Sequence, residues 1–337
     1  MLFGGYGAEV WTRRLKQLDL AAGSLGAVVI GRNEGARLVA CLESLSGAVR
    51  PLVYVDSGST DGSVAAATAA GALVVALDTT IPFTAARARN AGLDRLIAAG
   101  APEFVQFVDG DCRVQPGWLP AAKAFLATHP EVAVVCGRRR EVHPEASVWN
   151  RLCDAEWDTP VGEAKACGGD ALMRSAALRQ VGGFDPTLIA GEEPELCLRL
   201  RAAGWRIWRL DAEMTLHDAA MHRIGQWWKR TRRTGFAFAE GAAMHGAAPE
   251  FHWVAETRRA LVWGLVLPVL ALLGCIVSPW AALLLAVYPV QVLRLWPRLG
   301  LERALFLTLG KLPEALGVVQ FWLNRLLHRR AALIEYK

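Results

Sequence analysis

Short runs of apolar and β-branched residues alternate with helix-like stretches along the first half of the chain, and this pattern constrains the fold more than any other feature. The predicted strands cover residues 27–30, 52–55, 73–77, 104–108 and 132–136. Helices are predicted between Asn33, a good N-cap, and Gly47, and over residues 61–70 and 84–99. Strands alternating with helices indicate an α/β domain with a Rossmann-like, mostly parallel sheet flanked by helices.

Polar loops follow several of these predicted strands. In open α/β sheets the ligand binds at the carboxyl edge, so the loops at 31–34, 56–61 and 109–111 predict one shared site. Asp109 and Asp111 end an apolar strand, and alternate residues of an extended segment point the same way, so both could approach one divalent cation. A plain Asp-Gly hairpin turn is the alternative interpretation of this motif.

The loop at 56–61 carries two further carboxylates. Asp56 lies at a strand end, where it could accept hydrogen bonds from a nucleobase or a ribose. Asp61 is as well explained by helix capping, and capping alone could account for the loop.

A series of motifs occurs in a fixed order between residues 25 and 235. They are Val28-Val-Ile-Gly-Arg-Asn33-Glu34, Val55-Asp56-Ser-Gly-Ser-Thr-Asp61-Gly, Ala88-Arg89-Asn90-Ala-Gly92, Asp109-Gly-Asp111, Gly168-Gly169, and Gly182-Gly-Phe-Asp185 followed by Gly191-Glu192-Glu193. This order and spacing resemble the family-2 glycosyltransferases with the GT-A fold. The resemblance implies transfer of a sugar from a nucleotide-diphosphate sugar to an acceptor hydroxyl, assisted by Mn²⁺ or Mg²⁺.

The resemblance also implies roles for individual residues. The donor-binding positions would be Asn33, Glu34, Asp56, Arg89, Asn90, Asp109, Gly168, Gly169 and Asp170. The metal would be held by Asp109 and Asp111, with Asp111 the more direct ligand. His217 stands where relatives often carry a histidine that completes the metal or diphosphate site, although a lone histidine is more often structural.

The catalytic base is expected in the Glu192-Glu193 pair. Glu193 stands where the family usually carries the aspartate of a Glu-Asp pair, and the Glu-Glu pair here leaves open which carboxylate acts. Pro194 is a good first helical residue, so we expect an exposed carboxylate at a loop-helix junction. A single displacement with this base predicts inversion at the anomeric carbon. Without the resemblance, both glutamates would be only favourable charges near a helix dipole.

A dense apolar block distinguishes the last eighty residues. Residues 260–277 carry no charge and could cross a bilayer, and a turn at 278–280 leads to a second, shorter run that ends near 293. Arginines flank both outer ends, at 258, 259, 294 and 298, so the positive-inside rule places both ends in the cytoplasm. The alternatives are a buried hairpin of a soluble domain and a re-entrant hairpin. Residues 303–327 look amphipathic and interfacial.

These features predict an N-terminal segment over residues 1–24, a GT-A domain over 25–235 and a membrane-associated helical region over 236–337. The first nineteen residues lack the apolar core of a signal peptide, which predicts a cytoplasmic catalytic domain at the cell membrane. Seven cysteines without a C-x-x-C pair argue against a disulfide framework or a zinc site. The net charge is only +5, and the basic clusters flank apolar segments, which favours lipid head groups over nucleic acid.

Other functions and partners stay open from the sequence. The C-terminal hairpin and the Leu-Ile-Glu-Tyr336-Lys337 end resemble members that build exopolysaccharide on lipid carriers, which implies a lipid-linked or glycan acceptor. Gln226-Trp-Trp-Lys-Arg230 is somewhat similar to the Gln-x-x-Arg-Trp element of processive synthases, and its cations could meet a diphosphate or lipid head groups. The alternatives are a sugar-phosphate nucleotidyltransferase and a catalytically silent nucleotide-binding membrane scaffold. The motifs do not determine the base, the sugar or the acceptor.

Overall fold

The computed structural model describes residues 24–329, which divide into two compact units. The first unit contains the described residues up to Val142 together with Trp157–Thr187 and Glu192–Asp218. The second contains His143–Glu156, Leu188–Gly191 and the described residues from Ala219 onward. The expected N-terminal segment and the Tyr336-Lys337 end lie outside the described residues.

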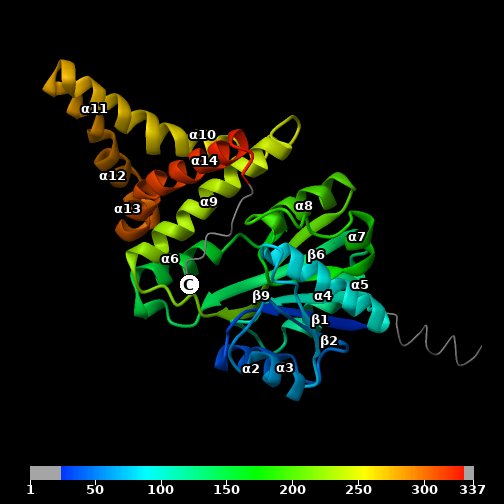
Figure 1. Cartoon of the computed structure of the whole chain (residues 1–337). Helices are drawn as coiled ribbons and strands as arrows, with labels where there is room; N and C mark the ends of the chain where they lie inside the picture. The colour runs from blue at the N-terminus through cyan, green and yellow to red at the C-terminus, as the bar shows by residue number, and fades with distance from the viewer. Residues whose placement is uncertain (1–23, 330–337) are drawn as a thin grey trace, which may run out of the picture. The chain divides into compact units, whose positions relative to one another are not determined.

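One mixed sheet forms the centre of the first unit (Figure 1). Its strand order among residues 24–329 is β3-β2-β1-β4-β8-β6-β9-β5, and β7 pairs with β9. The strands are β1 (Leu25–Gly31), β2 (Leu52–Asp56), β3 (Leu73–Ala76), β4 (Phe104–Asp109), β5 (Cys112–Val114), β6 (Val132–Glu141), β7 (Gly162–Ala164), β8 (Ala171–Arg174) and β9 (Arg206–His217). The five predicted strands and the α/β class are confirmed.

The first four strands pair in parallel, as the alternating sequence pattern predicts. Beyond β4 the sheet is mixed, because β8 runs antiparallel to both β4 and β6, whereas β6 and β9 are parallel. The β6 strand continues past its predicted end to Glu141, and it carries register shifts around Arg138. Such bulges change the direction in which neighbouring side chains point.

Helices cover both faces of this sheet. They are α2 (Ala36–Leu45), α3 (Ser63–Ala69), α4 (Ala85–Gly100), α5 (Trp118–Thr128), α7 (Ser175–Gln180) and α8 (Glu192–Ala202). In Figure 1, α2 and α3 lie on one side of β1 and β2, and α4 packs on the other side. Gly92 permits this contact, since a Cβ there would overlap the side chain of Val28.

The predicted cap of the first helix is wrong. The α2 helix begins at Ala36 with Gly35 as its N-cap, and Gly35 has a positive φ of 54° that suits glycine. The Asn33 side-chain oxygen instead accepts a hydrogen bond of 2.7 Å from the Thr60 amide. Asn33 therefore ties two strand-end loops together and does not start the helix.

The second unit is helical. Its longer elements are α6 (Val148–Trp157, whose last residue belongs to the first unit), α9 (Ile224–His245), α10 (Val254–Leu261), η2 (Val262–Val266), α11 (Leu267–Val277), η3 (Pro279–Ala286), α12 (Val287–Leu299), α13 (Leu301–Leu309) and α14 (Lys311–Leu326). A small apolar core joins α9 and α14, in which the rings of Phe236 and Phe321 are 5.4 Å apart. The α9 helix runs without interruption through residue 235, where the sequence predicts a domain boundary.

Within residues 24–329, three helical stretches are long and apolar enough to cross a membrane: Val254–Val277, Pro279–Leu299 and Leu301–Leu326. A π-helical segment, Val262–Val266, precedes Pro268 in the first stretch. Proline lacks an amide hydrogen and its ring meets the carbonyl four residues earlier, so a wider turn accommodates it. The most apolar window of the third stretch is 50% buried within the protein, against 11% and 0% for the other two.

Candidate active site at the carboxyl edge of the sheet

Asp109, the last residue of β4, and Asp111, two residues further on, have different partners. Gly110 donates its amide to the Ile30 carbonyl over 2.8 Å, and β5 then pairs with β9, not with β4. The segment is therefore not a hairpin, and Asp111 lies in a turn beyond the extended strand. The expectation that both carboxylates point the same way is wrong: Asp109 contacts arginines, whereas Asp111 lies beside His217.

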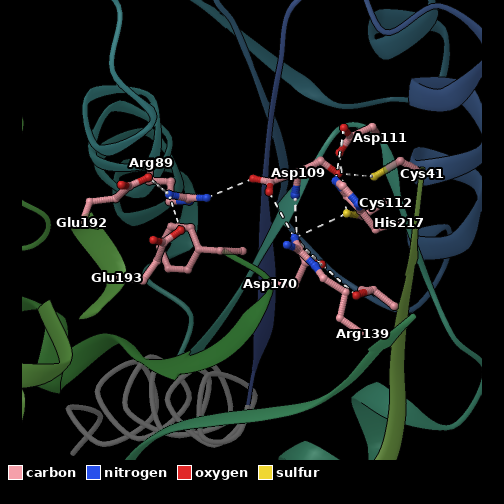
Figure 2. A network of polar contacts seen from close by, with 12 residues as sticks. Cys41, Arg89, Asp109, Asp111, Cys112, Arg139, Asp170, Glu192, Glu193 and His217 are labelled. Atoms are coloured by element: carbon pink, nitrogen blue, oxygen red, sulfur yellow. Dashed lines mark hydrogen bonds and ion pairs between the residues drawn. The ribbon is translucent and has the colours of Figure 1, made fainter. Parts of the chain in front are cut away.

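Arg89 joins three carboxylates in a buried cluster. Its guanidinium lies 2.9 Å from Asp109, 2.8 Å from Glu192 and 2.9 Å from Glu193, and its side chain is only 3% exposed. Figure 2 shows Arg89 between the two glutamates and Asp109. Burial alone would raise the pKa of Asp109, but the guanidinium groups of Arg89 and Arg139 hold it below its ordinary value.

Arg139 extends this network on the far side of Asp109 (Figure 2). It lies 3.1 Å from Asp109 and 2.8 Å from Asp170. Asp170 is completely buried, and it also accepts hydrogen bonds from the Asp109 amide and the Thr215 hydroxyl. Asp170 thus links the end of β4 to β9 and Arg139, whereas the resemblance implies that it binds the donor.

A second cluster gathers around His217. Its Nε2 is 3.4 Å from an Asp111 oxygen, and the ligand atoms of Asp111, Cys112 and His217 lie within 4.8 Å of one another. Burial, followed by the charge of Arg139, lowers the pKa of His217 to about 4, so its imidazole is neutral at pH 7. The edge of the Trp157 ring packs against it, with centroids 4.7 Å apart.

These groups fit a hard divalent cation. His217 Nδ1 is buried and has no hydrogen-bond partner among residues 24–329, and carboxylate oxygen with neutral imidazole is a donor set that manganese accepts. Asp109, Cys112 and Asp170 make a second compact group beside the first. Burial raises the pKa of the Cys112 thiol well above its ordinary value, so the thiol is not a thiolate ligand at pH 7.

The start of α8 differs from expectation in two ways. The helix begins at Glu192, two residues before Pro194, so neither glutamate sits in a loop. The carboxylates are also not exposed, since the side chains of Glu192 and Glu193 are 5% and 13% accessible. Burial and the neighbouring charge of Glu192 raise the pKa of Glu193 to about 7, although Arg89 opposes the shift.

Gly169 lies where the network is most crowded. A Cβ at this position would be 2.5 Å from Arg89 Nη2, 3.0 Å from an Asp109 oxygen and 3.1 Å from a Glu193 oxygen. The absence of a side chain is therefore required for these three groups to converge. A Cβ at Gly168 would meet nothing within 4 Å.

The carboxylates of the 56–61 loop already accept local hydrogen bonds. Asp56 accepts from the amides of Gly58 and Ser59, both at 3.0 Å, and from the Tyr54 hydroxyl at 3.2 Å. Asp61 accepts from the Ser63 amide and from the Gly35 amide, but the N-cap of α3 is Gly62, so the expected capping role of Asp61 is wrong.

Two other predicted donor contacts are occupied within the protein. Glu34 forms an ion pair with Arg37 at 2.7 Å. Asn90 exchanges two hydrogen bonds with the backbone of Phe184, which fixes the Gly-Gly-Phe-Asp loop on α4.

The sequence analysis overlooked Arg139 and Trp157. Arg139 lies within Arg138-Arg139-Arg140 at the end of β6, and three consecutive cations at a strand end were the available signal. Trp157 carries no comparable signal, although the Arg139 guanidinium lies 5.3 Å from its ring centre.

The polar element at the start of α9 is engaged within the second unit. Gln226 accepts from the amides of His222 and Arg223 as part of a capping box. Arg230 forms a bidentate pair with Glu156, and Arg232 donates to Gln320.

Part of this chain matches a known protein family. Residues 27–171 match the model of glycosyl transferase family 2. A pre-mycofactocin glycosyltransferase of Mycobacterium tuberculosis is 30% identical over 48% of this chain, and the chain matches 35% of that relative's length. The succinoglycan biosynthesis protein ExoA of Rhizobium meliloti is 24% identical, with 78% of this chain and 84% of that protein covered.

A solved structure resembles almost the whole chain. The mannosyltransferase PcManGT from Pyrobaculum calidifontis, in complex with GDP-Man and Mn²⁺, covers 94% of this chain and 96% of its own, with a TM-score of 0.61 at 20% identity. At that identity the likeness bears on the fold alone. Residues 27–171 therefore match glycosyl transferase family 2, and the chain as a whole shares its fold with this mannosyltransferase, in agreement with the expected GT-A-like fold.

Proposed function

We propose that this protein transfers a sugar from a nucleotide-diphosphate sugar to an acceptor hydroxyl, with a divalent cation and with inversion at the anomeric carbon. The observation that carries the proposal is the convergence of Arg89, Asp109 and Glu193 around Gly169 at the carboxyl edge of the sheet. Ligands of α/β sheets bind at this edge. The proposal also rests on the family-2 match over residues 27–171.

The donor nucleotide is assigned to the loops that follow β1 and β2. Asp56 is 5% exposed and accepts three hydrogen bonds, and a carboxylate has about four acceptor sites, so one remains for a base or a ribose. Its three local bonds hold the loop in one conformation before the donor arrives. We assign Asn33 the related task of joining this loop to the one after β1.

A divalent cation would be held by Asp111 and His217, with Asp109 nearby. When bound, it supplies positive charge that neutralises the diphosphate as it leaves. The PcManGT complex contains Mn²⁺, which supports the same choice here. Arg139 keeps Asp109 ionised, and the buried, neutral His217 can offer a lone pair without first losing a proton.

The acceptor proton is assigned to Glu193. A general base works best when its pKa lies near the working pH, and the pKa of Glu193 is raised to about 7. Glu192 is more buried and supplies the negative charge that raises this pKa. Arg89 holds both carboxylates in place, so that Glu193 would take the proton of the hydroxyl that attacks opposite the leaving group.

The helical region would bring this reaction to a lipid-linked acceptor. We propose that Val254–Val277 and Pro279–Leu299 cross the cell membrane as a hairpin and leave the catalytic domain in the cytoplasm. The flanking arginines support this orientation. Leu301–Leu326 is half buried against its own unit, which favours an interfacial position over a third crossing.

The test is transfer by the detergent-solubilised full chain, with a panel of nucleotide-diphosphate sugars, Mn²⁺ and membrane lipid extract. Glu193→Gln keeps the size of the side chain but cannot accept a proton, so turnover should fall by roughly 10²–10⁴-fold. Donor binding, measured by thermal stabilisation with nucleotide diphosphate and Mn²⁺, should persist. Excess chelator should stop transfer by the unmodified protein.

Glu192→Gln is the matched control for this test. If Glu192→Gln abolishes turnover and Glu193→Gln does not, the base is Glu192. Full turnover by both variants, or full activity in excess chelator, would contradict the proposed mechanism.

A further inference from the structure

Trp157, the last residue of α6, contacts two side chains of the candidate active site at once. The centre of its ring lies 5.3 Å from the guanidinium carbon of Arg139 and 4.7 Å from the centre of the His217 imidazole. All three residues belong to the first unit, and Trp157 is half-buried. The indole takes part in no step of the proposed reaction, so these two contacts call for another explanation.

The orientation of the His217 ring depends on packing. A histidine that binds a metal usually forms a hydrogen bond through its other ring nitrogen, and this bond fixes the rotation of the imidazole. In His217, Nδ1 is buried and has no hydrogen-bond partner among residues 24–329, and Nε2 lies 3.4 Å from an Asp111 oxygen. Trp157 packs at 89° to the imidazole, a favoured geometry for two aromatic rings, and this contact opposes rotation of the ring.

Trp157 also holds Arg139. A guanidinium group within about 6 Å of the centre of an indole ring is attracted to its π electrons. Arg139 meets this condition at 5.3 Å, while its nitrogens lie 3.1 Å from Asp109 and 2.8 Å from Asp170. The indole therefore joins the arginine that keeps Asp109 ionised to the histidine of the candidate metal site.

The chain next to Trp157 is attached to β6 and β9. Asp158 lies 3.5 Å from Arg138 in β6 and 3.6 Å from Arg209 in β9. The same two strands carry the two side chains that Trp157 contacts. Two consecutive residues thus contact one pair of strands, which limits the positions open to the indole.

We propose that Trp157 is a positioning residue for the divalent cation and acts through His217 and Arg139. The indole holds the imidazole beside Asp111 and the guanidinium group beside Asp109. It offers no ligand atom, since its nitrogen is only a hydrogen-bond donor, so its effect on the cation is indirect. Ligands that are already in place lose less freedom when they bind, and the affinity rises accordingly. This inference rests on the proposed function, which assigns the cation to Asp111 and His217.

The test is titration of the detergent-solubilised full chain with Mn²⁺ alone, in which electron paramagnetic resonance measures the free cation. Trp157→Leu removes the aromatic ring, so Mn²⁺ affinity should weaken by roughly 10–100-fold, the usual loss when a residue that orients a metal-binding histidine is replaced. Trp157→Phe keeps an aromatic ring and should restore most of the affinity. A residue that only filled space would not show this difference between leucine and phenylalanine.

Trp208→Leu is the matched control. Trp208 is also half-buried, and the Arg206 guanidinium carbon lies 5.3 Å from its ring centre, the same distance as in the Trp157 pair. Trp208 lies on β9 and packs near Phe125, away from the candidate metal ligands. Its replacement should lower the free energy of unfolding, measured with urea, and leave the Mn²⁺ affinity unchanged.

Three outcomes decide the matter. An unchanged Mn²⁺ affinity in Trp157→Leu, or an equal loss of affinity in Trp208→Leu, would overturn the positioning role and leave the proposed function intact. If the unmodified protein does not bind Mn²⁺, the proposed metal dependence fails and the role of Trp157 fails with it. If Trp157→Leu does not fold, Trp157→Met takes its place, because methionine adapts to fill the space and has no aromatic ring.

Discussion

The two units of this protein differ in which side chains they bury and which they expose. The first unit buries its large apolar side chains, such as Trp118 and Phe107, and also buries charges such as Arg89 among carboxylates. In the second unit, large apolar side chains face outward, and Ile276, Val277 and Trp280 are 81%, 90% and 78% exposed. Monomeric soluble proteins rarely expose such a continuous apolar surface.

The two patterns of burial suit different solvents, water for the first unit and lipid for the second. Burial of apolar groups away from water stabilises the first unit, and buried charges such as Arg89 are tolerated because they have close counter-charges. The exposed helices of the second unit satisfy their backbone groups internally, which is the condition for a segment placed in lipid. Two kinds of substitution test this difference between the units: removal of a counter-charge from the first unit, and addition of a charge to the second.

The largest effect is expected from Arg89→Leu. It leaves Asp109, Glu192 and Glu193 without their shared cation, and breaking such a buried pair costs about 3–5 kcal/mol of unfolding free energy. The loss should be measured by urea unfolding of the detergent-solubilised chain. Without Arg89 the three carboxylates have higher pKa values in the folded protein and bind protons more readily, so the deficit should shrink as the pH falls from 8 to 5.

Arg206→Leu is the control, because it breaks a surface pair with Glu163 and should change stability very little. An Arg89→Leu protein as stable as its parent at pH 8 would mean that the buried network is not a source of stability.

A somewhat smaller effect is expected from Leu270→Arg in α11. Leu270 is 52% exposed and lies in the most apolar candidate span, where a central arginine costs about 2.5–3.5 kcal/mol on insertion. The fraction of protein that resists alkaline extraction from membranes should fall. Leu270→Ile preserves the apolar surface and should behave like the parent. Equal extraction of all three proteins would argue that this helix does not enter the membrane.

The smallest effect is a pH dependence carried by Glu193. Its raised pKa predicts that kcat/KM falls by about tenfold for each pH unit below about 7, because the base must be ionised. Glu192→Gln removes a negative charge that raises this pKa, so the acid limb should move to lower pH. If kcat/KM falls at the same pH in both proteins, a group other than Glu193 controls this pH dependence.

The raised pKa of Glu193 also makes the free energy of unfolding depend on pH, but in the opposite direction to activity. The folded pKa of Glu193 lies above its ordinary value of 4.5, so its contribution favours the folded state at low pH and is lost as the pH rises toward about 7. Ionised Glu193 thus destabilises the folded protein, and such perturbed pKa values are common for groups used in catalysis.

Much of the fold could be predicted because it depends on local patterns. The alternation of β-branched and helical segments predicts β1, β2, β3, β4 and β6 but not the short β5, and the apolar block predicts the exposed helices. The Asn33 cap failed because a contact with Thr60, distant in sequence, competed successfully for the side chain. The exposure of Glu193 was mispredicted because a helix start in sequence does not reveal what packs over it.

Some residues of the candidate site could likewise be predicted from the sequence, and others could not. Asp56, Asp109, Asp111 and Glu193 were predicted as site residues from strand ends and motif order, and the last three lie at one edge of the sheet. Arg139 was not identified, because its role depends on β6 lying next to β8, where Asp170 precedes the strand. Antiparallel pairing of β8 with β4 and β6 has no signature in the periodicity of any of these segments.

The sequence by itself determined the α/β class, the family-2 motifs and the apolar block, since periodicity, motif order and hydropathy are properties of neighbouring residues. Only the tertiary structure decided that Asp109 and Asp111 face different partners, that Arg89 links Asp109 to both glutamates, and that Arg138 and Arg209 converge on Asp158. The physical reason is that charge interactions depend on distance and burial. Residues that are tens or more than a hundred positions apart come close together and become buried only when the sheet assembles.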